Sequence, residues 1–412
     1  MASKVKATTT TAAPTTNGNL PKGWRMVRFG EVVRDVNEAE RSPLDAGLER
    51  FVGLEHIEPE NLHLKQWGLL ADGEISFTKR FRKGQVLFGK RRAYQRKVAV
   101  AEFDGICSSD ILTFEPKGDV LSPALLPFIV QSEGFLEHAL GTSSGSLSPR
   151  TRWSQLQDYE FPLPPKDEQR RIAEILWAAD ESVESRLRVL RSIGAAWQGL
   201  IDIIVPDPSA APAARLSRLG DLCVMQNGRP FPSSNYSDAG FKLLRPGNLA
   251  PNGRLIWPHG ATVFLDAKFA DENGDWIIRP GDVVINLTAQ SLEEGFMGRV
   301  CLAAAGDESL LNQRLGRFIV KSGTEREYVF RILQTSRFRH VVESHCEGSK
   351  VRHTYFRHFA NLPVVLLSQE EQQRVIKAGR DVDQARESAS QAVDKAQALF
   401  ATLREHLLGG DS

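Results

Sequence analysis

The sequence contains an internal repeat, and this duplication constrains the fold more than any other feature. The stretch RMVRFGEV at 25–32 returns 190 residues later as RLSRLGDL at 215–222. Three more pairs follow in the same order, and their offset reaches 203: 52–57 with 245–249, 83–88 with 280–285, and 168–172 with 371–375. Loop insertions between duplicated halves produce such a drift. We therefore expect two similar halves with one shared plan.

Each half ends in a long amphipathic helix. The first is expected at 166–204, after two prolines and with acids in its first turn; the second is expected at 368–408, where Ser368 and Glu371 have capping-box spacing. Their apolar stripes are Ile172, Leu176, Ala179, Val183, Leu187, Leu190, Ile193, Trp197 and Leu200, and Val375, Val382, Ala389, Ala392, Ala396, Leu399, Leu403 and Leu407. Stripes this long favour two helices packed along their length. The alternative is that each helix lies on its own domain.

The regions before these helices carry short strand-forming runs broken by Gly, Pro and Asn. The fold class expected is α+β: two similar mixed domains joined by two long helices packed along their length, a pseudo-two-fold internal repeat. The expected boundaries are a disordered tail at 1–19, a first mixed domain at 20–165, a linker at 205–214 and a second mixed domain at 215–367.

One stretch, GQVLFGKR at 84–91, spells most of a phosphate-binding loop. Such a loop needs small residues and a hydroxyl after its lysine, but strand formers fill the middle and Arg91 stands in the hydroxyl position. The second copy, PGDVVINLT at 280–288, keeps the glycine and the apolar run and loses the Gly-Lys. A turn followed by a buried strand is therefore the better interpretation.

The net charge is only +1, so a nucleic-acid surface needs local clustering. Residues 79–97 hold nine Lys or Arg and no acid, with aromatic residues interleaved. Uncompensated positive charge favours a polyanion such as DNA, whereas the alternative is a solvated face. The candidate DNA contacts in this run are Lys79, Arg80, Lys90, Arg91, Arg92, Tyr94, Arg96 and Lys97.

Two hydroxyl-rich or basic loops, at 141–152 and 347–354, occupy matching places in the halves. Hydroxyl groups suit phosphate oxygens, Arg suits guanine edges, and Asn or Gln suits adenine, although such loops can also be plain surface turns. The candidates here are Ser144, Ser146, Arg150, Arg152, Lys350, Arg352 and His353, joined by Asn286, Thr288, Gln290, Gln313 and Arg314.

Catalytic patterns are sparse. Asp104, Glu115 and Lys117 have nuclease-like spacing, but the second half has no counterpart of the Glu. We find no dinucleotide fingerprint, zinc spacing, signal peptide or apolar run long enough for a membrane helix. The four cysteines are far apart, as in a reduced cytoplasmic protein. We expect no catalytic site and no bound metal.

The pattern as a whole resembles the specificity subunit of type I restriction-modification systems over about residues 20–408. The residues that carry the resemblance are LPKGW at 20–24, RFGE at 28–31, KGQVLF at 83–88 and FPLPPKDEQ at 161–169, with their second copies. The copy at 364–372, VVLLSQEEQ, lacks the prolines.

The resemblance implies a non-catalytic, cytoplasmic subunit that reads an asymmetric bipartite target in double-stranded DNA. The regions 20–165 and 215–367 would be its two target recognition domains, and the two long helices would pack as an antiparallel coiled coil between them. Its partners would be methylation subunits, two in number, and motor-nuclease subunits. S-adenosylmethionine, Mg and ATP would be held by those partners, with no cofactor on this chain. The rival hypotheses are a Mg-dependent nuclease and a coiled-coil scaffold whose basic surface binds a partner.

Overall fold

The computed structural model describes residues 20–73, 75–145, 148–290, 295–348 and 351–409. The chain forms two compact units, residues 1–185 with 393–412 and residues 186–392. Each unit takes in part of both long helices, so the units are larger than the recognition domains expected at 20–165 and 215–367, whose boundaries stay a prediction. The tail expected at 1–19 lies outside the described residues.

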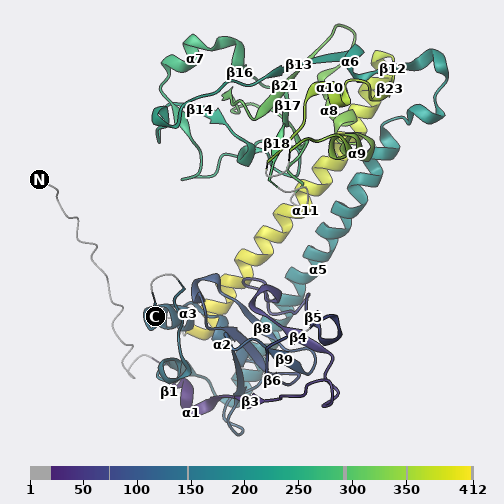
Figure 1. The fold of residues 1–412 in the computed structure, drawn as a ribbon. Coiled ribbons are helices and arrows are strands. Elements are labelled where there is room, and N and C mark those ends of the chain that lie inside the picture. The colour runs from purple at the N-terminus through teal and green to yellow at the C-terminus, as the bar shows by residue number, and fades with distance from the viewer. Residues whose placement is uncertain (1–19, 74, 146–147, 291–294, 349–350, 410–412) are drawn as a thin grey trace, which may run out of the picture. The chain divides into compact units, whose positions relative to one another are not determined.

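The first unit is a mixed α/β body (Figure 1). Its strands are β1 Arg25–Arg28, β2 Val33–Asp35, β3 Glu38–Ala39, β4 Arg50–Val52, β5 Gly68–Leu69, β6 Lys79–Phe81, β7 Val86–Gly89, β8 Val98–Val100, β9 Gly105–Cys107, β10 Ile111–Pro116 and β11 Glu160–Leu163. Its helices are α1 Phe29–Val32, α2 Leu126–Gln131, α3 Glu133–Gly141, α4 Trp153–Leu156, the first part of α5 Lys166–Ile204 and the last part of α11 Gln369–Gly409.

The second unit has the same kinds of element. Its strands are β12 Leu216–Arg218, β13 Cys223–Asn227, β14 Phe241–Leu244, β15 Phe264–Leu265, β16 Ile277–Ile278, β17 Val283–Asn286, β18 Thr288–Ala289, β19 Val300–Leu302, β20 Ser309–Leu311, β21 Leu315–Val320, β22 Arg352–His353 and β23 Pro363–Val365. Its helices are the last part of α5, α6 Leu219–Leu222, α7 Lys268–Glu272, α8 Arg326–Leu333, α9 Ser336–Ser344, α10 Phe356–Phe359 and the first part of α11.

Sheet topology repeats between the units. A four-stranded sheet runs β2-β10-β7-β8 in the first and β13-β21-β17-β19 in the second, and the pairs β1-β11 and β12-β23 are both antiparallel. The helices after these sheets match as well: Ser132 caps α3 by accepting from Phe135 N–H, and Thr335 caps α9 by accepting from Phe338 N–H. The sequence repeat thus corresponds to a repeat of topology.

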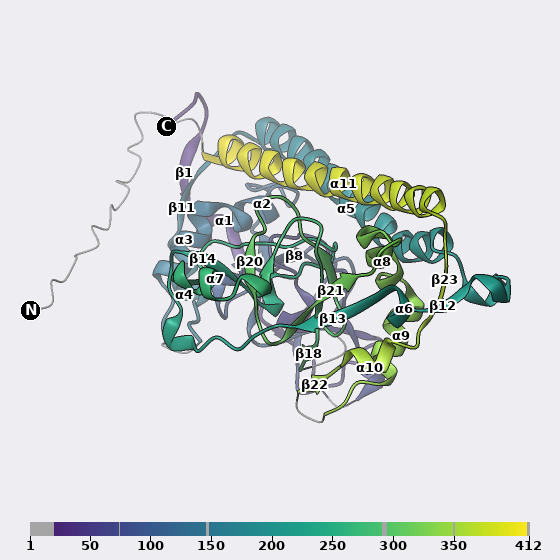
Figure 2. The ribbon, with the colours of Figure 1, turned by 90° about the horizontal axis from the view of Figure 1, so that it is seen from above.

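The two long helices are present as α5 and α11, drawn in teal and yellow in Figure 1. The expected capping box forms, because Ser368 N–H donates to the carboxylate of Glu371 at 2.8 Å and Glu371 N–H donates to the Ser368 hydroxyl at 3.3 Å. In the second unit the helices meet where Trp197 Nε1–H donates to Asp383 Oδ1 at 3.3 Å. Viewed from above, α8 lies next to α11 in this unit (Figure 2).

The apolar stripes are only partly buried. Leu200 is 41% exposed and Leu399 60% exposed, so their predicted places in a seam are wrong. Instead Ile376, Val393 and Phe400 are buried. The buried face of each long helix is set by the body that it packs against. That face does not follow one line of three-four spacing over about 40 residues.

Helix α5 also corrects the expectation about apolar runs. Among the described residues, it is the helix long and apolar enough to meet a membrane-span test of length and composition. Trp197, Ile201 and Val205 at its end belong to the hydrophobic core of the second unit. These three residues are packed against protein, but only 17% of the apolar stretch is buried.

A buried glutamine fixes the start of α5. Gln169 is 1% exposed, and its amide group donates to the carbonyls of Pro164 and Val120 at 2.9 and 3.1 Å. Its carbonyl oxygen accepts from Ser122 N–H at 2.8 Å. One side chain thus satisfies backbone groups of the helix entry and of the loop before α2.

Gln372 does the same for α11. It is 2% exposed, donates to the carbonyls of Leu367 and Gly323 at 3.0 and 3.1 Å, and accepts from Glu325 N–H at 2.8 Å. The Glu-Gln pair that recurs in the sequence therefore has a structural cause. Only an amide of this length supplies two donors and one acceptor at this point.

Replacing either buried glutamine should destabilise its own unit. Gln169→Leu or Gln372→Leu removes the side-chain partner of two carbonyls and one N–H, most of them only partly accessible to water, a loss of about 1–3 kcal/mol in the free energy of unfolding. Gln373→Leu, at the exposed neighbouring position, is the control and should change stability by less than about 0.5 kcal/mol. Urea unfolding of the three variants checks this, and equal stability of all three would contradict the assigned role.

Candidate nucleic-acid interface

The phosphate-loop spelling belongs to a buried strand. Gly84 adopts a left-handed turn with φ of 89°, and all four residues of β7 that follow are buried. No loop of free N–H groups is formed there. Beyond β7 the chain makes a tight basic turn, in which Arg92 and Arg96 have φ of 56° and 53° on either side of one 3-10 turn. Left-handed backbone at two non-glycine residues is strained and marks functional turns.

The structure brings this basic turn together with the hydroxyl-rich loop. Arg92 N–H donates to Pro149 O at 2.8 Å, and Thr151 N–H donates to Lys90 O at 3.1 Å. The basic turn (residues 90–97) and the loop (residues 141–152), predicted separately, therefore form one surface. Ser146 of this loop lies outside the described residues.

Asp110 joins the two segments electrostatically. Its carboxylate accepts from Arg150 Nε at 2.8 Å and Nη2 at 3.3 Å, and from Arg91 Nη1 at 3.4 Å. The hydrogen bond from Arg150 lowers the pKa of Asp110, so it stays ionised. Arg91 Nε donates further to Ser148 Oγ at 2.7 Å. Sequence reasoning missed Asp110 and Ser148, because neither lies in a basic motif.

The basic run is not uncompensated, which corrects one premise of the sequence argument. Acids from elsewhere in the chain pair with several of its cations: Lys79 with Asp35, Arg82 with Glu38, and Arg96 with Glu60 and Glu133. The ammonium of Lys79 is 3.0 Å from its partner, and both side chains are nearly buried. Lys79 is therefore a core ion pair and is removed from the DNA candidates.

Other cations of the run, and Arg152 of the hydroxyl-rich loop, keep their charge available. Arg80, Lys90, Arg92 and Arg152 have no ion pair with another described residue at 4 Å or less, and Tyr94 beside them is 54% exposed. Burial, followed by the nearby Lys79, lowers the pKa of Lys90.

Two further candidates contact main-chain groups or loops. Lys97 Nζ donates to Leu54 O at 2.5 Å, which ties this residue to the protein. Ser144 exchanges both backbone hydrogen bonds with Arg150 at 3.0 Å, so it closes the base of the hydroxyl-rich loop.

The second unit assembles its matching surface from β18 and β22. Thr288 pairs with His353 and Ala289 with Arg352, so residues 286–290 and the loop at 347–354 lie together. Gln290, Gln313 and Arg314 are exposed at this surface or beside it. Lys350 lies outside the described residues.

Asn286 is not free to contact a base. It is fully buried, and its amide donates to the carbonyls of Thr288 and Phe296 at 2.8 Å each. Its carbonyl oxygen accepts from Thr288 N–H at 3.4 Å. This side chain clamps the end of β17, so the candidate role in adenine recognition is withdrawn.

A histidine outside every motif ties the first body to α5. His63 Nε2 lies 2.7 Å from Asp180 Oδ2 and its Nδ1 lies 3.4 Å from Glu102. The hydrogen bond to Asp180 raises the pKa of His63 above its usual 6.5. The stabilisation from this pair is therefore fully present below pH 6.5 and is lost as the pH rises through the raised folded-state value.

The nuclease-like set has structural duties. Lys117 Nζ donates to Gly30 O, and the equivalent Lys321 Nζ donates to Gly220 O, in the half without the acid. Glu115 accepts from Arg34 and Gln85 on the neighbouring strands. In the described part of the chain no cluster of three His, Cys, Asp or Glu is placed to hold a metal ion.

The three buried cysteines of the described residues are not placed to act as nucleophiles. Burial raises the pKa of Cys107, Cys223 and Cys301 to about 12, which keeps these thiols protonated and inert.

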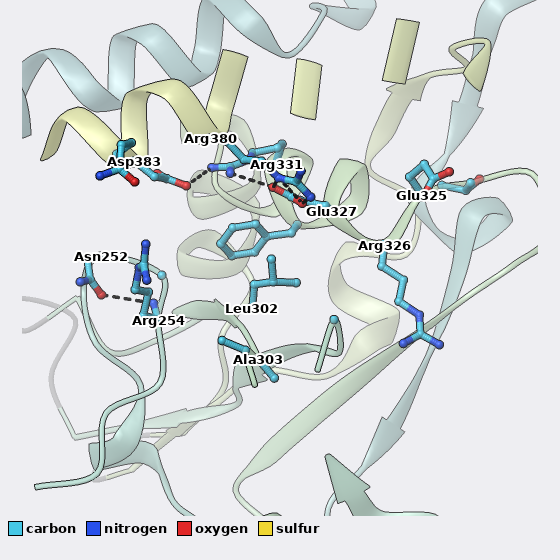
Figure 3. A pocket seen from close by; sticks show the side chains of 16 residues that line it. Asn252, Arg254, Leu302, Ala303, Glu325, Arg326, Glu327, Arg331, Arg380 and Asp383 are labelled. Atoms are coloured by element: carbon cyan, nitrogen blue, oxygen red, sulfur yellow. Dashed lines mark hydrogen bonds and ion pairs between the residues drawn. The ribbon is translucent and has the colours of Figure 1, made fainter. Parts of the chain in front are cut away.

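A hollow of about 750 Å³ in the second unit is charged but internally paired (Figure 3). Arg331, 1% exposed, contacts Glu327 at 3.1 Å and Asp383 at 2.7 Å, and Arg380 pairs with the same glutamate. These contacts link α8 to α11. The lining charges are thus committed to the fold and present no catalytic set.

Comparison with known proteins is consistent with this geometry. Residues 21–189 match the family described as the type I restriction modification DNA specificity domain. The specificity subunit of the type I restriction enzyme EcoDI of Escherichia coli is 28% identical over 180 residues, which span 41% of this chain and 38% of that protein. The MjaVIII specificity subunit of Methanocaldococcus jannaschii is 20% identical over 400 residues, which span 88% of this chain and 87% of that protein.

Solved structures share the fold along nearly the whole chain. One chain, from work on complex assembly and conformational transition of the type I R-M system, has a TM-score of 0.60 at 20% identity and covers 95% of this chain and 100% of its own. The type I S subunit from M. genitalium has a TM-score of 0.50 at 14% identity, with coverage of 96% and 98%. Residues 21–189 thus match a type I restriction modification DNA specificity domain, and the chain is similar to specificity subunits of type I restriction enzymes; the match to the EcoDI subunit spans less than half of that protein's length.

Proposed function

We propose that this chain is the DNA-recognition subunit of a type I restriction-modification complex and reads an asymmetric bipartite target. The observation that carries the proposal is a polar surface that recurs in both units and is called the recognition edge. It contains Arg91, Arg92 and Arg150 in the first unit and Thr288, Gln290 and His353 in the second. In both units the strand after the turn glycine, β7 or β17, leads to a polar segment packed against a loop from further along the chain.

The residues at these equivalent edges differ. The first presents Arg91, Arg92 and Arg150, and the second presents Thr288, Gln290 and His353. Side chains of such different hydrogen-bonding character favour different bases. Two unlike half-sites therefore fit one duplicated fold better than a palindrome does.

In this proposal α5 and α11 pack as an antiparallel coiled coil that relates the two recognition domains by a pseudo-two-fold axis and sets the gap between half-sites. The helices have 39 and 41 residues, and each begins at a buried glutamine clamp. A rigid helical spacer is the physical device that other bipartite DNA readers use to fix half-site separation.

The partners follow from the same proposal. In this proposal the chain is non-catalytic, and adenine methylation and DNA cleavage fall to two methylation subunits and to motor-nuclease subunits in the cytoplasm. S-adenosylmethionine, Mg and ATP would bind those partners and not this chain.

Removing unpaired cations should weaken DNA binding measurably. For the double variant Arg92→Gln with Arg152→Gln, the slope of log binding constant against log salt should become shallower by up to about 0.9 for each lost phosphate contact. Arg82→Gln removes a charge that Glu38 already balances, and should leave the slope near the native value. Fluorescence anisotropy with a labelled duplex at several salt concentrations gives the slopes. Identical slopes for all three proteins would place the basic turn away from DNA.

The direct test of function is whether the chain determines which DNA sequence its methylation partners modify. Co-expressed with cognate methylation subunits in a host lacking other methylases, it should direct adenine methylation to one sequence class, and host DNA should be unmodified without it. Long-read methylation mapping makes the measurement. Methylation independent of the chain, or salt-labile binding indifferent to sequence, would favour a scaffold whose basic surface binds a partner.

A further inference from the structure

The two recognition edges share a backbone frame but carry opposite charges at one position. Lys90 N–H donates to Asp110 O in the first unit, and Leu287 N–H donates to Arg314 O in the second, at 3.0 and 2.9 Å. Asp110 and Arg314 are therefore structural equivalents. Arg314 has no ion pair with another described residue, whereas Asp110 sits between two arginines.

An acid at this place is costly for simple DNA attraction. A carboxylate beside phosphate-binding arginines repels phosphate and cancels one of their two charges. Its side chain is 17% exposed, and Arg91 and Arg150 are 39% and 48% exposed. The arginines thus reach solvent while the acid lies beneath them.

The contacts of Asp110 show that it holds the two arginine side chains in place. Arg150 meets it with Nε and Nη2, a two-pronged contact that fixes the plane of the guanidinium. Arg91 is held from two sides, by Asp110 at Nη1 and by Ser148 at Nε. Without Asp110, both side chains would lose more conformational entropy on binding DNA, and the repulsion between their like charges would push them apart.

We propose that Asp110 is a positioning residue of the first recognition domain: it orients Arg91 and Arg150 as a fixed pair and so sets the domain's discrimination between DNA sequences. The inference rests on the proposed function. It assigns sequence discrimination to a residue that makes DNA attraction weaker, so the two properties should separate on mutation.

The test measures binding of the full chain, with its methylation subunits, to two duplexes: the methylated sequence mapped for the native complex and the same duplex with one half-site scrambled. Each half-site is scrambled in turn. The ratio of the two dissociation constants is the discrimination. Asp110→Asn should lower the ratio about tenfold or more for the half-site read by the first domain, and leave the other half-site's ratio unchanged. Binding to fully scrambled DNA should tighten, with a salt slope steeper by up to about 0.9.

Two variants separate orientation from charge. Arg150→Lys keeps the charge but lacks the planar fork, so the ratio should fall while the salt slope on scrambled DNA stays native. Asp104→Asn makes the same charge change as Asp110→Asn at an exposed acid, whose carboxylate accepts from Lys83 N–H at 2.9 Å, and should leave the ratio native. Thermal unfolding of each complex verifies folding, and Arg150→Lys decides the matter if Asp110→Asn does not fold.

A native ratio in both Asp110→Asn and Arg150→Lys would overturn the inference and leave the proposed function standing. An equal loss in Asp104→Asn would also overturn it, because charge alone would then explain the effect. If the native complex itself does not discriminate between the duplexes, the proposed function fails first.

Discussion

A single buried glutamine ties each long helix to the body that precedes it. Gln169 and Gln372 each satisfy two carbonyls and one N–H. Both glutamine side chains are almost closed to solvent, so losing these bonds leaves a buried amide unpaired and disfavours any other placement of helix and body within each unit. A helix held this way at its first turn can act as a rigid extension of its own recognition domain.

The repeat and the long helices could be predicted from sequence because both have local signatures. Turn glycines at 84 and 281, the capping box at Ser368 and the recurring Glu-Gln pair are read directly from the letters. The buried face of the helices was harder to predict. Ile376 and Phe400 are buried because of the bodies they meet, and no local period records that.

The candidate interface was predictable in its location and much less so in its members. A run of nine cations indicates a basic turn, but only tertiary contacts show that Asp35 neutralises Lys79 within the core and that Asp110 lies beneath two arginines. Asn286 illustrates the same limit, since its polar amide serves the backbone. Long-range partners decide which charges remain available, and spacing along the chain does not encode them.

Within the proposed function, recognition rests on edges that are alike in backbone and unlike in side chains, while spacing rests on α5 and α11. The most direct measurement maps the methylated sequence for the native chain and for one with four residues, about one helical turn, inserted after Leu187 in α5 and matched near Ala392 in α11. The same two half-sites with an altered number of base pairs between them is the predicted result. An unaltered gap, with both half-sites still read, would contradict the role of the helices as the spacer.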